Sequence, residues 1–126
     1  MSCEVYVCNL NQPGLPKIRA RYCDSFLCRL RGLTFRRSLP QGEGLLLVET
    51  KDSLMDSTIH MLFMWMDLVV VWIDSSLSVV DVKLARRWRL AYFPQKPARY
   101  ILELPFESAG SFSIGDLVAF EKLEHS

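Results

Sequence analysis

The chain has no excess of charge of one sign and no enrichment in glycine or proline. Its 126 residues include 15 Lys or Arg and 14 Asp or Glu, a net charge of +1, which argues against a protein whose whole surface binds nucleic acid. Six glycines and six prolines exclude collagen-like and low-complexity chains. Because half of the residues are hydrophobic and 23% are charged, a disordered tail is excluded too, and the length predicts a single domain over residues 1–126.

A membrane-spanning run is also missing. The most apolar stretch, residues 59–73, is shorter than the roughly 20 residues that a spanning helix needs, and it carries His60 and Asp67. Its β-branched and aromatic end instead predicts two strands that meet near Asp67. Residues 1–10 lack the basic and apolar segments of a secretory signal. We therefore expect a soluble, cytoplasmic monomer or weak oligomer that does not bind membranes.

The four cysteines lack the C-x-x-C spacing of zinc ribbons and redox sites. Cys3 and Cys8 are five residues apart, as are Cys23 and Cys28. Within one strand this spacing points two side chains to opposite faces, and within one helix it separates them by about 140°. The pattern predicts four free thiols, buried and inert, and no metal site.

Motifs of known catalytic sites are absent as well. The chain has no H-E-x-x-H, no G-x-S-x-G and no glycine-rich dinucleotide loop. Glu43 between two glycines is not a phosphate loop, because the G-K-[ST] sequence is missing and a carboxylate repels an anion. We predict no cofactor, and a binding protein is favoured over an enzyme.

Short segments with alternating polarity are present instead. Residues 17–22 alternate without a fault, with Ile18, Ala20 and Tyr22 facing inward. The apolar spacing then changes to that of a helix, which predicts a short helix near residues 24–31 with Gly32 as its C-terminal stop. Other strands are predicted at residues 3–10, 45–48, 58–64, 68–73, 79–82, 100–104 and 117–122, with a loop at 49–57 and a single helical turn at 108–113.

These elements predict a mainly β fold. Many short strands with turns every 8 to 12 residues are typical of a small single-domain barrel or of a two-sheet sandwich. The one short helix near residues 24–31 completes the expected architecture.

Three ordered blocks of the sequence resemble the domain of unknown function 192 family. The first is R-x-x-G-L-x-x-R-x-x-L-P-x-G-E-G-L-L at residues 29–46. The second is T-I-H-M-L-F-M at residues 58–64, and the third is A-R-Y-I-L-E-L-P at 98–105 followed by I-G-D at 114–116. The resemblance runs from about residue 9 to residue 122. It implies a small, mostly β fold, and it assigns no activity.

The chain departs from the family pattern at two places. The family's acidic residue is expected at Val69, and here Asp67 lies two residues earlier. The family's usual Asp-x-x-Gly hairpin turn reads Asp74-Ser75-Ser76-Leu77, without its glycine. Whether Asp67 takes over the role of the acidic position is left open by the sequence.

The leading functional interpretation is a non-enzymatic module that binds a small molecule or a peptide segment. Small β-barrels commonly bind ligands at their mouths, where apolar walls and a few polar groups converge. The candidate apolar and aromatic lining is His60, Met64, Trp65 and Trp88, and the candidate polar anchors are Arg29, Arg36 and Glu103. Arg29 and Arg36 also have a structural interpretation, in which either pairs with Glu43 or Glu103.

Two alternatives belong to other classes. An acid–base enzyme would use His60 with Asp67 or Glu103. A nucleic-acid binder would use the basic clusters at residues 17–37 and 83–99, where Arg86-Arg87-Trp88-Arg89 combines cations with an aromatic ring. This second alternative requires both clusters to share one face.

Overall fold

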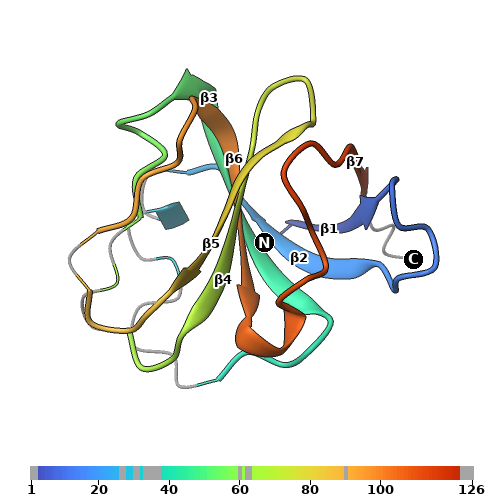
Figure 1. Ribbon diagram of the computed structural model, residues 1–126, viewed down its shortest axis with the longest axis horizontal. Helices are drawn as coiled ribbons and strands as arrows, with labels where there is room; N and C mark the ends of the chain where they lie inside the picture. Colours follow the sequence, from blue (N-terminus) through green and yellow to red (C-terminus); the bar gives the residue numbers. More distant parts are fainter. Residues whose placement is uncertain are drawn as a thin grey trace.

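The computed structural model describes residues 3–25, 28–29, 32, 38–59, 61, 64–89 and 91–122. Within them the chain is mainly β, which confirms the predicted fold class (Figure 1). The elements in chain order are β1 (Cys3–Asn9), β2 (Ile18–Cys23), β3 (Glu43–Ser53), β4 (Leu68–Ile73), β5 (Val79–Ala85), β6 (Ala98–Pro105), the 3-10 turn η1 (Phe106–Ser108) and β7 (Val118–Lys122).

All seven of these strands form one curled sheet, a half-barrel, in the order β5-β4-β6-β3-β2-β1-β7. Neighbouring strands are antiparallel except β2 and β3, which run parallel and are joined by the long crossover at residues 24–42. The two ends of the sheet approach each other, because Ser78 bridges to Leu117 and the Val79 amide donates to the Asp116 carbonyl at 2.8 Å. The sheet therefore curls far enough to enclose an interior.

Each face of the sheet carries its own apolar cluster. The first cluster fills the inside of the curl and draws on β1 to β7, with Val7, Leu46, Val71 and Leu102 among its buried members. The second lies on the outer face of β3, β4 and β6, and it includes Trp72 and Ile101. Segments 54–67 and 86–97, at the left of Figure 1, lie side by side through the Ile59–Tyr92 bridge. Ile59 and Met61 of these segments are buried in the second cluster, so β3, β4 and β6 have buried apolar residues on both faces.

The alternation predicted for residues 17–22 is confirmed on β2. Ile18 and Ala20 are buried, whereas Arg19 and Arg21 are exposed. The N-Q-P-G sequence forms the predicted turn, with the Gln12 and Leu15 amides donating to the carbonyls of Asn9 and Gln12. This hairpin sets the β1–β2 register.

Three predicted elements differ from the structure. Among the described residues of 58–64, only Ile59 makes a β-bridge, so the predicted strand is wrong there. The predicted loop at 49–57 is replaced up to Ser53 by β3, whose register shifts between Val48 and Ser53. The helical turn expected at 108–113 comes earlier, as η1. Strand pairing at residues 49–53 and 59 depends on partners distant in sequence, Ala98 of β6 for Ser53 and Tyr92 for Ile59.

Part of the predicted helix near residues 24–31 lies outside the described residues, namely Phe26, Leu27, Leu30 and Arg31. The described part is helical: the Arg29 amide donates to the Ser25 carbonyl at 3.0 Å, and the Gly32 amide donates to the Cys28 carbonyl at 2.9 Å. Ser25 caps this turn by accepting the Cys28 N–H at its hydroxyl. Gly32 has φ +51°, the left-handed conformation expected of a C-terminal stop.

The prediction of four free thiols is wrong, because Cys23 and Cys28 form a disulfide. The spacing excludes a disulfide only if both cysteines lie in one strand or one helix. Here Cys23 ends β2, whereas Cys28 lies in the helical turn that follows the bend at Asp24 and Ser25. Cys3 and Cys8 are free thiols. Since disulfides persist mainly in oxidising compartments, the cytoplasmic location stays a prediction.

Among the helices of the described residues, none has the length and apolar content to cross a bilayer.

Candidate functional site

Two of the predicted site residues, Arg36 and His60, lie outside the described residues. The predicted cavity shared by these two side chains is therefore untested. The structure places the other five, Arg29, Met64, Trp65, Trp88 and Glu103, in three different surroundings.

Trp65 and Trp88 meet at the surface. Trp65 lies three residues before Leu68, and Trp88 lies three residues after Ala85, the partner of Leu68 in the β4–β5 register. The hairpin thus brings the two indoles together although 22 residues separate them in sequence. Their ring centroids are 5.5 Å apart in an edge-to-face arrangement at 85°, and the residues are 43% and 46% exposed. Large aromatic rings with this much exposed area are typical of binding surfaces.

A groove of about 390 Å³ is lined by Trp65 of this aromatic pair. It lies where three strand ends meet, since Leu68 at the start of β4 pairs with Ala85 at the end of β5 and with Pro105 at the end of β6. We call it the tryptophan groove, and its lining is Ser38, Leu39, Trp65, Met66, Asp67, Arg87, Pro105, Phe106 and Glu107. Its walls combine exposed rings with charges of both signs.

Asp67 holds the turn that presents Trp88. The Asp67 carboxylate accepts the backbone N–H of Arg87 at 2.8 Å and lies 3.6 Å from the guanidinium Nε of the same residue. The Trp88 amide in turn donates to the Met61 carbonyl at 2.8 Å. The acid–base alternative named Asp67 beside His60, which lies outside the described residues; in the structure the Asp67 carboxylate contacts Arg87 at the groove wall.

Trp88 has an unusual backbone conformation. Its φ is +65°, the left-handed region that bulky residues rarely occupy. Such a conformation costs on the order of 1 kcal/mol or more, and strained residues cluster at functional sites. The neighbouring hydrogen bonds of Arg87 and Trp88 hold the turn in place.

Arg29 ties the crossover to the sheet. Its Nε lies 3.3 Å from Glu49 Oε1, and its Nη1 donates to the carbonyls of Val48, at 3.2 Å, and of Asp24. The partner is Glu49 rather than the expected Glu43 or Glu103. Burial raises the pKa of Glu49, and the positive charge of Arg29 opposes that rise. These contacts support the structural interpretation of Arg29.

Glu103 is a buried carboxyl in the middle of the sheet. It lies on β6 between Leu45 of β3 and Val70 of β4, on the face of the second apolar cluster, and it is 4% exposed. Its Oε1 has no hydrogen-bond partner within the described part of the chain. A Cβ added to Gly32 would lie 3.8 Å from this oxygen, so the crossover covers it closely. Burial raises the pKa of Glu103 to about 7.

Met64 lies away from the groove surface. It is buried in the second apolar cluster, and its amide donates to the Met61 carbonyl. In contrast, sequence reasoning did not single out Arg87 alone or Phe106 as groove residues. The signal for both was indirect: Arg87 lies two residues after the end of β5 and Phe106 directly follows β6, and the sheet topology brings these two strand ends to the groove.

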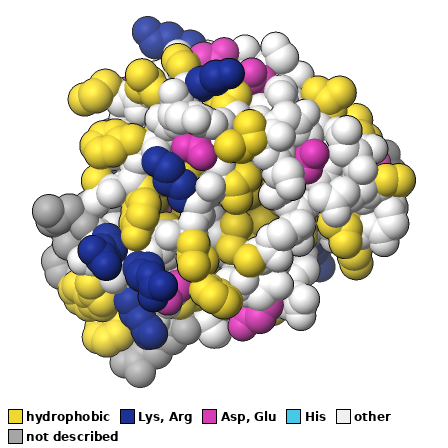
Figure 2. All heavy atoms as spheres, in the orientation of Figure 1, with side chains coloured by type: hydrophobic (Ala, Val, Ile, Leu, Met, Phe, Trp, Pro, Cys, Tyr) yellow, Lys and Arg dark blue, Asp and Glu magenta, His cyan; other side chains and the backbone are white. Residues whose placement is uncertain are grey.

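The two basic clusters lie on different strands. Lys17 pairs with Glu121 at 2.8 Å and Arg19 pairs with Glu4, so the charges beside β2 are partly neutralised. Three strands, β4, β6 and β3, separate β2 from β5 in the sheet. Both clusters have exposed cations: Lys17, Arg19 and Arg21 in the first, and Arg86, Arg87 and Arg89, which flank Trp88 in sequence, in the second. Figure 2 shows Lys and Arg side chains gathered among hydrophobic ones at the left of the molecule.

Comparison with known proteins supplies relatives over most of the chain. The family model DUF192 (Uncharacterized ACR) matches residues 8–120. A UPF0127 protein of Thermococcus kodakarensis is 37% identical over 108 residues, which cover 84% of this chain and 67% of the relative. A UPF0127 protein of Pyrococcus furiosus is 32% identical over 85% of this chain and 90% of its own length. For the Thermococcus relatives the match spans from 54% to 67% of their length.

Two solved structures share the fold. A protein of unknown function from Novosphingobium aromaticivorans DSM 12444 superposes with a TM-score of 0.79 at 19% identity, over 94% of this chain and 84% of its own. A protein of Sinorhizobium meliloti 1021, named as a proposed transcription regulator, superposes with a TM-score of 0.81 at 18% identity, over 95% and 94% of the two chains.

Proposed function

Because the chain belongs to the DUF192 family, whose relatives are named only as members of an uncharacterised family, we propose its function from the tryptophan groove. In this proposal the protein is a non-enzymatic binding module that holds a short peptide segment. The observation that carries the proposal is the exposed, edge-to-face pair formed by Trp65, which lines the groove, and Trp88, which contacts Trp65. Tryptophan is enriched among the residues that contribute most to binding at protein interfaces.

The groove lining favours a peptide segment. Trp65 and Phe106 offer apolar area for a side chain of the ligand, while Arg87 and Glu107 present charges of opposite sign. A peptide carries apolar side chains, amide dipoles and charges within a short length, so it can satisfy such a mixed surface. An exposed charged group beside an apolar contact supplies orientation more than affinity.

Selection from a random peptide library tests this proposal. Seven-residue peptides displayed on phage are selected on the wild-type protein, and the enriched sequences are synthesised and titrated by fluorescence anisotropy. We expect Trp65→Ala to weaken their binding about tenfold or more. Phe93→Ala is the matched control, because Phe93 is 53% exposed and lies outside the groove lining. Peptides that bind the Trp65→Ala variant as tightly as wild type would overturn the proposal.

Replacement of Trp88 by glycine should separate binding from stability. Glycine adopts φ +65° without strain, which offsets the lost contact with Trp65, worth about 0.5–1.5 kcal/mol. We expect the free energy of unfolding to change by less than about 1 kcal/mol, whereas affinity for the selected peptides falls about tenfold. Urea unfolding and anisotropy on the same samples measure the two effects, and a large loss of stability would show that Trp88 has a structural role.

Single-stranded nucleic acid is a second candidate, favoured by the exposed Arg86, Arg87 and Arg89 around Trp88. Cationic side chains next to an aromatic ring can follow a phosphate backbone while a base stacks. A labelled oligothymidine titrated at several salt concentrations tests this candidate, since binding should weaken steeply with salt. The double variant Arg86→Ala/Arg89→Ala should lose this binding, and Lys17→Ala/Arg19→Ala on the ion-paired strand should keep it. Binding that both double variants retain would count against this candidate.

A further inference from the structure

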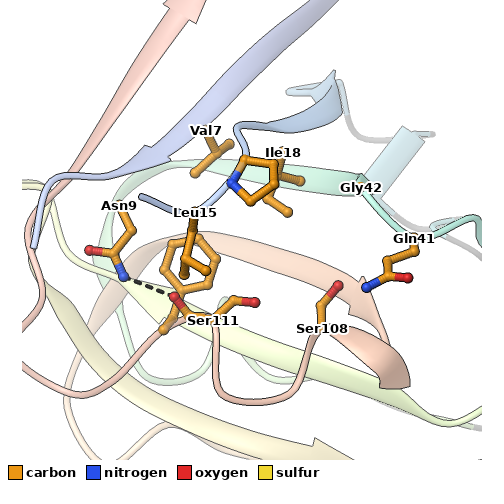
Figure 3. A pocket seen from close by; sticks show the side chains of 10 residues that line it. Val7, Asn9, Leu15, Ile18, Gln41, Gly42, Ser108 and Ser111 are labelled. Atoms are coloured by element: carbon orange, nitrogen blue, oxygen red, sulfur yellow. Dashed lines mark hydrogen bonds between the residues drawn. The ribbon is translucent and has the colours of Figure 1, made fainter. Parts of the chain in front are cut away.

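A second cavity lies on another part of the molecule, between the β1–β2 hairpin, the start of β3 and the chain after η1 (Figure 3). Its volume is about 150 Å³. Val7, Ile18 and Phe112 of the first apolar cluster form part of its wall, and Leu15 and Pro16 of the hairpin add to it. No charged side chain is among the described residues that line it, which are Val7, Asn9, Leu15, Pro16, Ile18, Gln41, Gly42, Ser108, Ser111 and Phe112.

One polar group points into this cavity without a partner. Ser108 is 5% exposed, and its hydroxyl makes no hydrogen bond with any described residue. In Figure 3 the hydroxyl is directed into the space between Ser108 and Gln41. The Ser108 hydroxyl keeps contact with solvent inside the cavity and is not committed to a described residue, so it can donate to a ligand or accept from one.

The other buried polar side chain at the cavity is already satisfied. Asn9 Nδ2 donates to the Ser111 carbonyl at 2.9 Å and to Asp116 Oδ2 at 2.8 Å, and Asn9 Oδ1 accepts the Asn11 amide at 3.0 Å. Asn9 therefore fixes the wall, and the polar side chains left for a ligand are those of Ser108, Ser111 and Gln41, whose amide is directed toward Ser108 in Figure 3.

We propose that this cavity is a second binding site, for a small uncharged molecule with a compact apolar body and one hydroxyl group, such as a phenol. The ligand is expected to be uncharged, because an ion would lose its hydration in this cavity and meet no opposite charge in the lining. The size follows from the volume, because an apolar cavity of about 150 Å³ accepts a ligand as large as benzene. The hydroxyl follows from Ser108, which can donate to it or accept from it.

Water in this cavity can be displaced by a ligand. The cavity opens to solvent on one side and its lining is mostly apolar, with Ser108, Ser111 and Gln41 as the polar side chains besides Asn9. A ligand whose ring fills the apolar part and whose hydroxyl reaches Ser108 replaces that water and also covers Val7 and Ile18. This arrangement distinguishes the cavity from the tryptophan groove, which is wide, open and charged.

Phenol and benzene are matched probes for this site, since they differ by the single hydroxyl group. Each is titrated into the isotope-labelled full chain while backbone amide chemical shifts are recorded. We expect saturable shifts at residues 7, 18 and 112, and an affinity for phenol about three to ten times that for benzene, the value of one net hydrogen bond. Trp65→Ala, in the groove, should leave both titrations unchanged.

Ser108→Ala assigns the hydrogen bond. In this variant phenol should bind as weakly as benzene, and benzene should bind as it does to wild type. Ser113→Ala is the control, because Ser113 is exposed and lies outside the lining. The proposal is overturned if phenol shows no saturable shifts in the cavity, or if Ser108→Ala retains the preference for phenol over benzene. Because the probes do not report on the groove, either failure would leave the peptide-binding proposal standing.

Discussion

Replacing Trp72 with alanine is expected to lower the free energy of unfolding by about 3–5 kcal/mol. Trp72 is completely buried on β4, where it pairs with Asp81 of β5 and Ile101 of β6. Its indole Nε1–H donates to the Ser57 carbonyl at 2.6 Å and so anchors the covering segment to the sheet. Alanine leaves a cavity in the second apolar cluster and leaves a buried carbonyl without its donor.

Urea unfolding followed by circular dichroism measures this effect. Trp65→Ala is the matched control, because the same side chain is removed from a position that is 43% exposed, and we expect a loss of about 1 kcal/mol there. Trp72→Phe should fall between the two, since it keeps most of the packing and loses the hydrogen bond, worth about 1–3 kcal/mol when a buried partner is left unsatisfied. Equal losses for Trp72→Ala and Trp65→Ala would contradict the described packing.

Sequence patterns predicted those strands whose signal is local. The alternation on β2 follows directly from the pleat, because every second side chain must face the core. β4 was predicted with its observed bounds from a continuous apolar run, which suits a strand covered on both faces. In contrast, residues 58–64 are also mostly apolar, yet among their described members only Ile59 makes a β-bridge, and Ile59, Met61 and Met64 are buried in the second apolar cluster.

In the turn after Asp74, Leu77 replaces the glycine of the family pattern, and neighbouring contacts offset the backbone strain of this replacement. Leu77 stands where the family places glycine, and its φ is +64°, a conformation that glycine adopts without strain. Two amides, those of Ser76 and Ser78, donate to Asp74 Oδ1 and hold the turn. The Leu77 side chain packs against the first apolar cluster, which offsets the strain. The sequence showed the departure, and the packing that tolerates it depends on distant residues.

The candidate site was predicted in part. Trp65 and Trp88 were both selected from the sequence, but their contact depends on the β4–β5 register, which the sequence left unstated. Once the pairing of Leu68 with Ala85 is known, Trp65, three residues before Leu68, and Trp88, three residues after Ala85, are expected to lie near each other. The cavity at Ser108 had no sequence signal, because its lining comes from four separate segments and none of them has a motif.

Wild-type stability is expected to fall by about 3 kcal/mol as the pH rises from 4.5 to about 7, through Glu103 alone. The pKa of this carboxyl is raised by burial from an ordinary value of 4.5 to about 7 in the fold. Between these two values the folded protein keeps the proton and the unfolded chain releases it, so rising pH favours the unfolded state. Below pH 4.5 both states are protonated, and above about pH 7 both are ionised, so the contribution is constant outside this window.

Glu103→Gln isolates this contribution, because glutamine has the shape of the protonated side chain and does not titrate. We expect the variant to match wild type within about 1 kcal/mol at pH 4.5 and to exceed its stability by about 3 kcal/mol at pH 8. Urea unfolding of both proteins across this pH range gives the difference between their free energies of unfolding. The titration of all other groups cancels in this difference. Glu43→Gln, at an exposed position at the start of β3, should show no such pH-dependent gain.

The same titration bears on the acid–base alternative. A carboxyl that ionises near pH 7 has the pKa that a general acid or base requires, yet Glu103 is 4% exposed beneath the crossover at Gly32. If the difference between Glu103→Gln and wild type rises between pH 4.5 and 7, the proton is held by burial in the free protein, without any substrate. A difference that stays flat would mean that Glu103 keeps its ordinary pKa, and the acid–base alternative would then lose this residue.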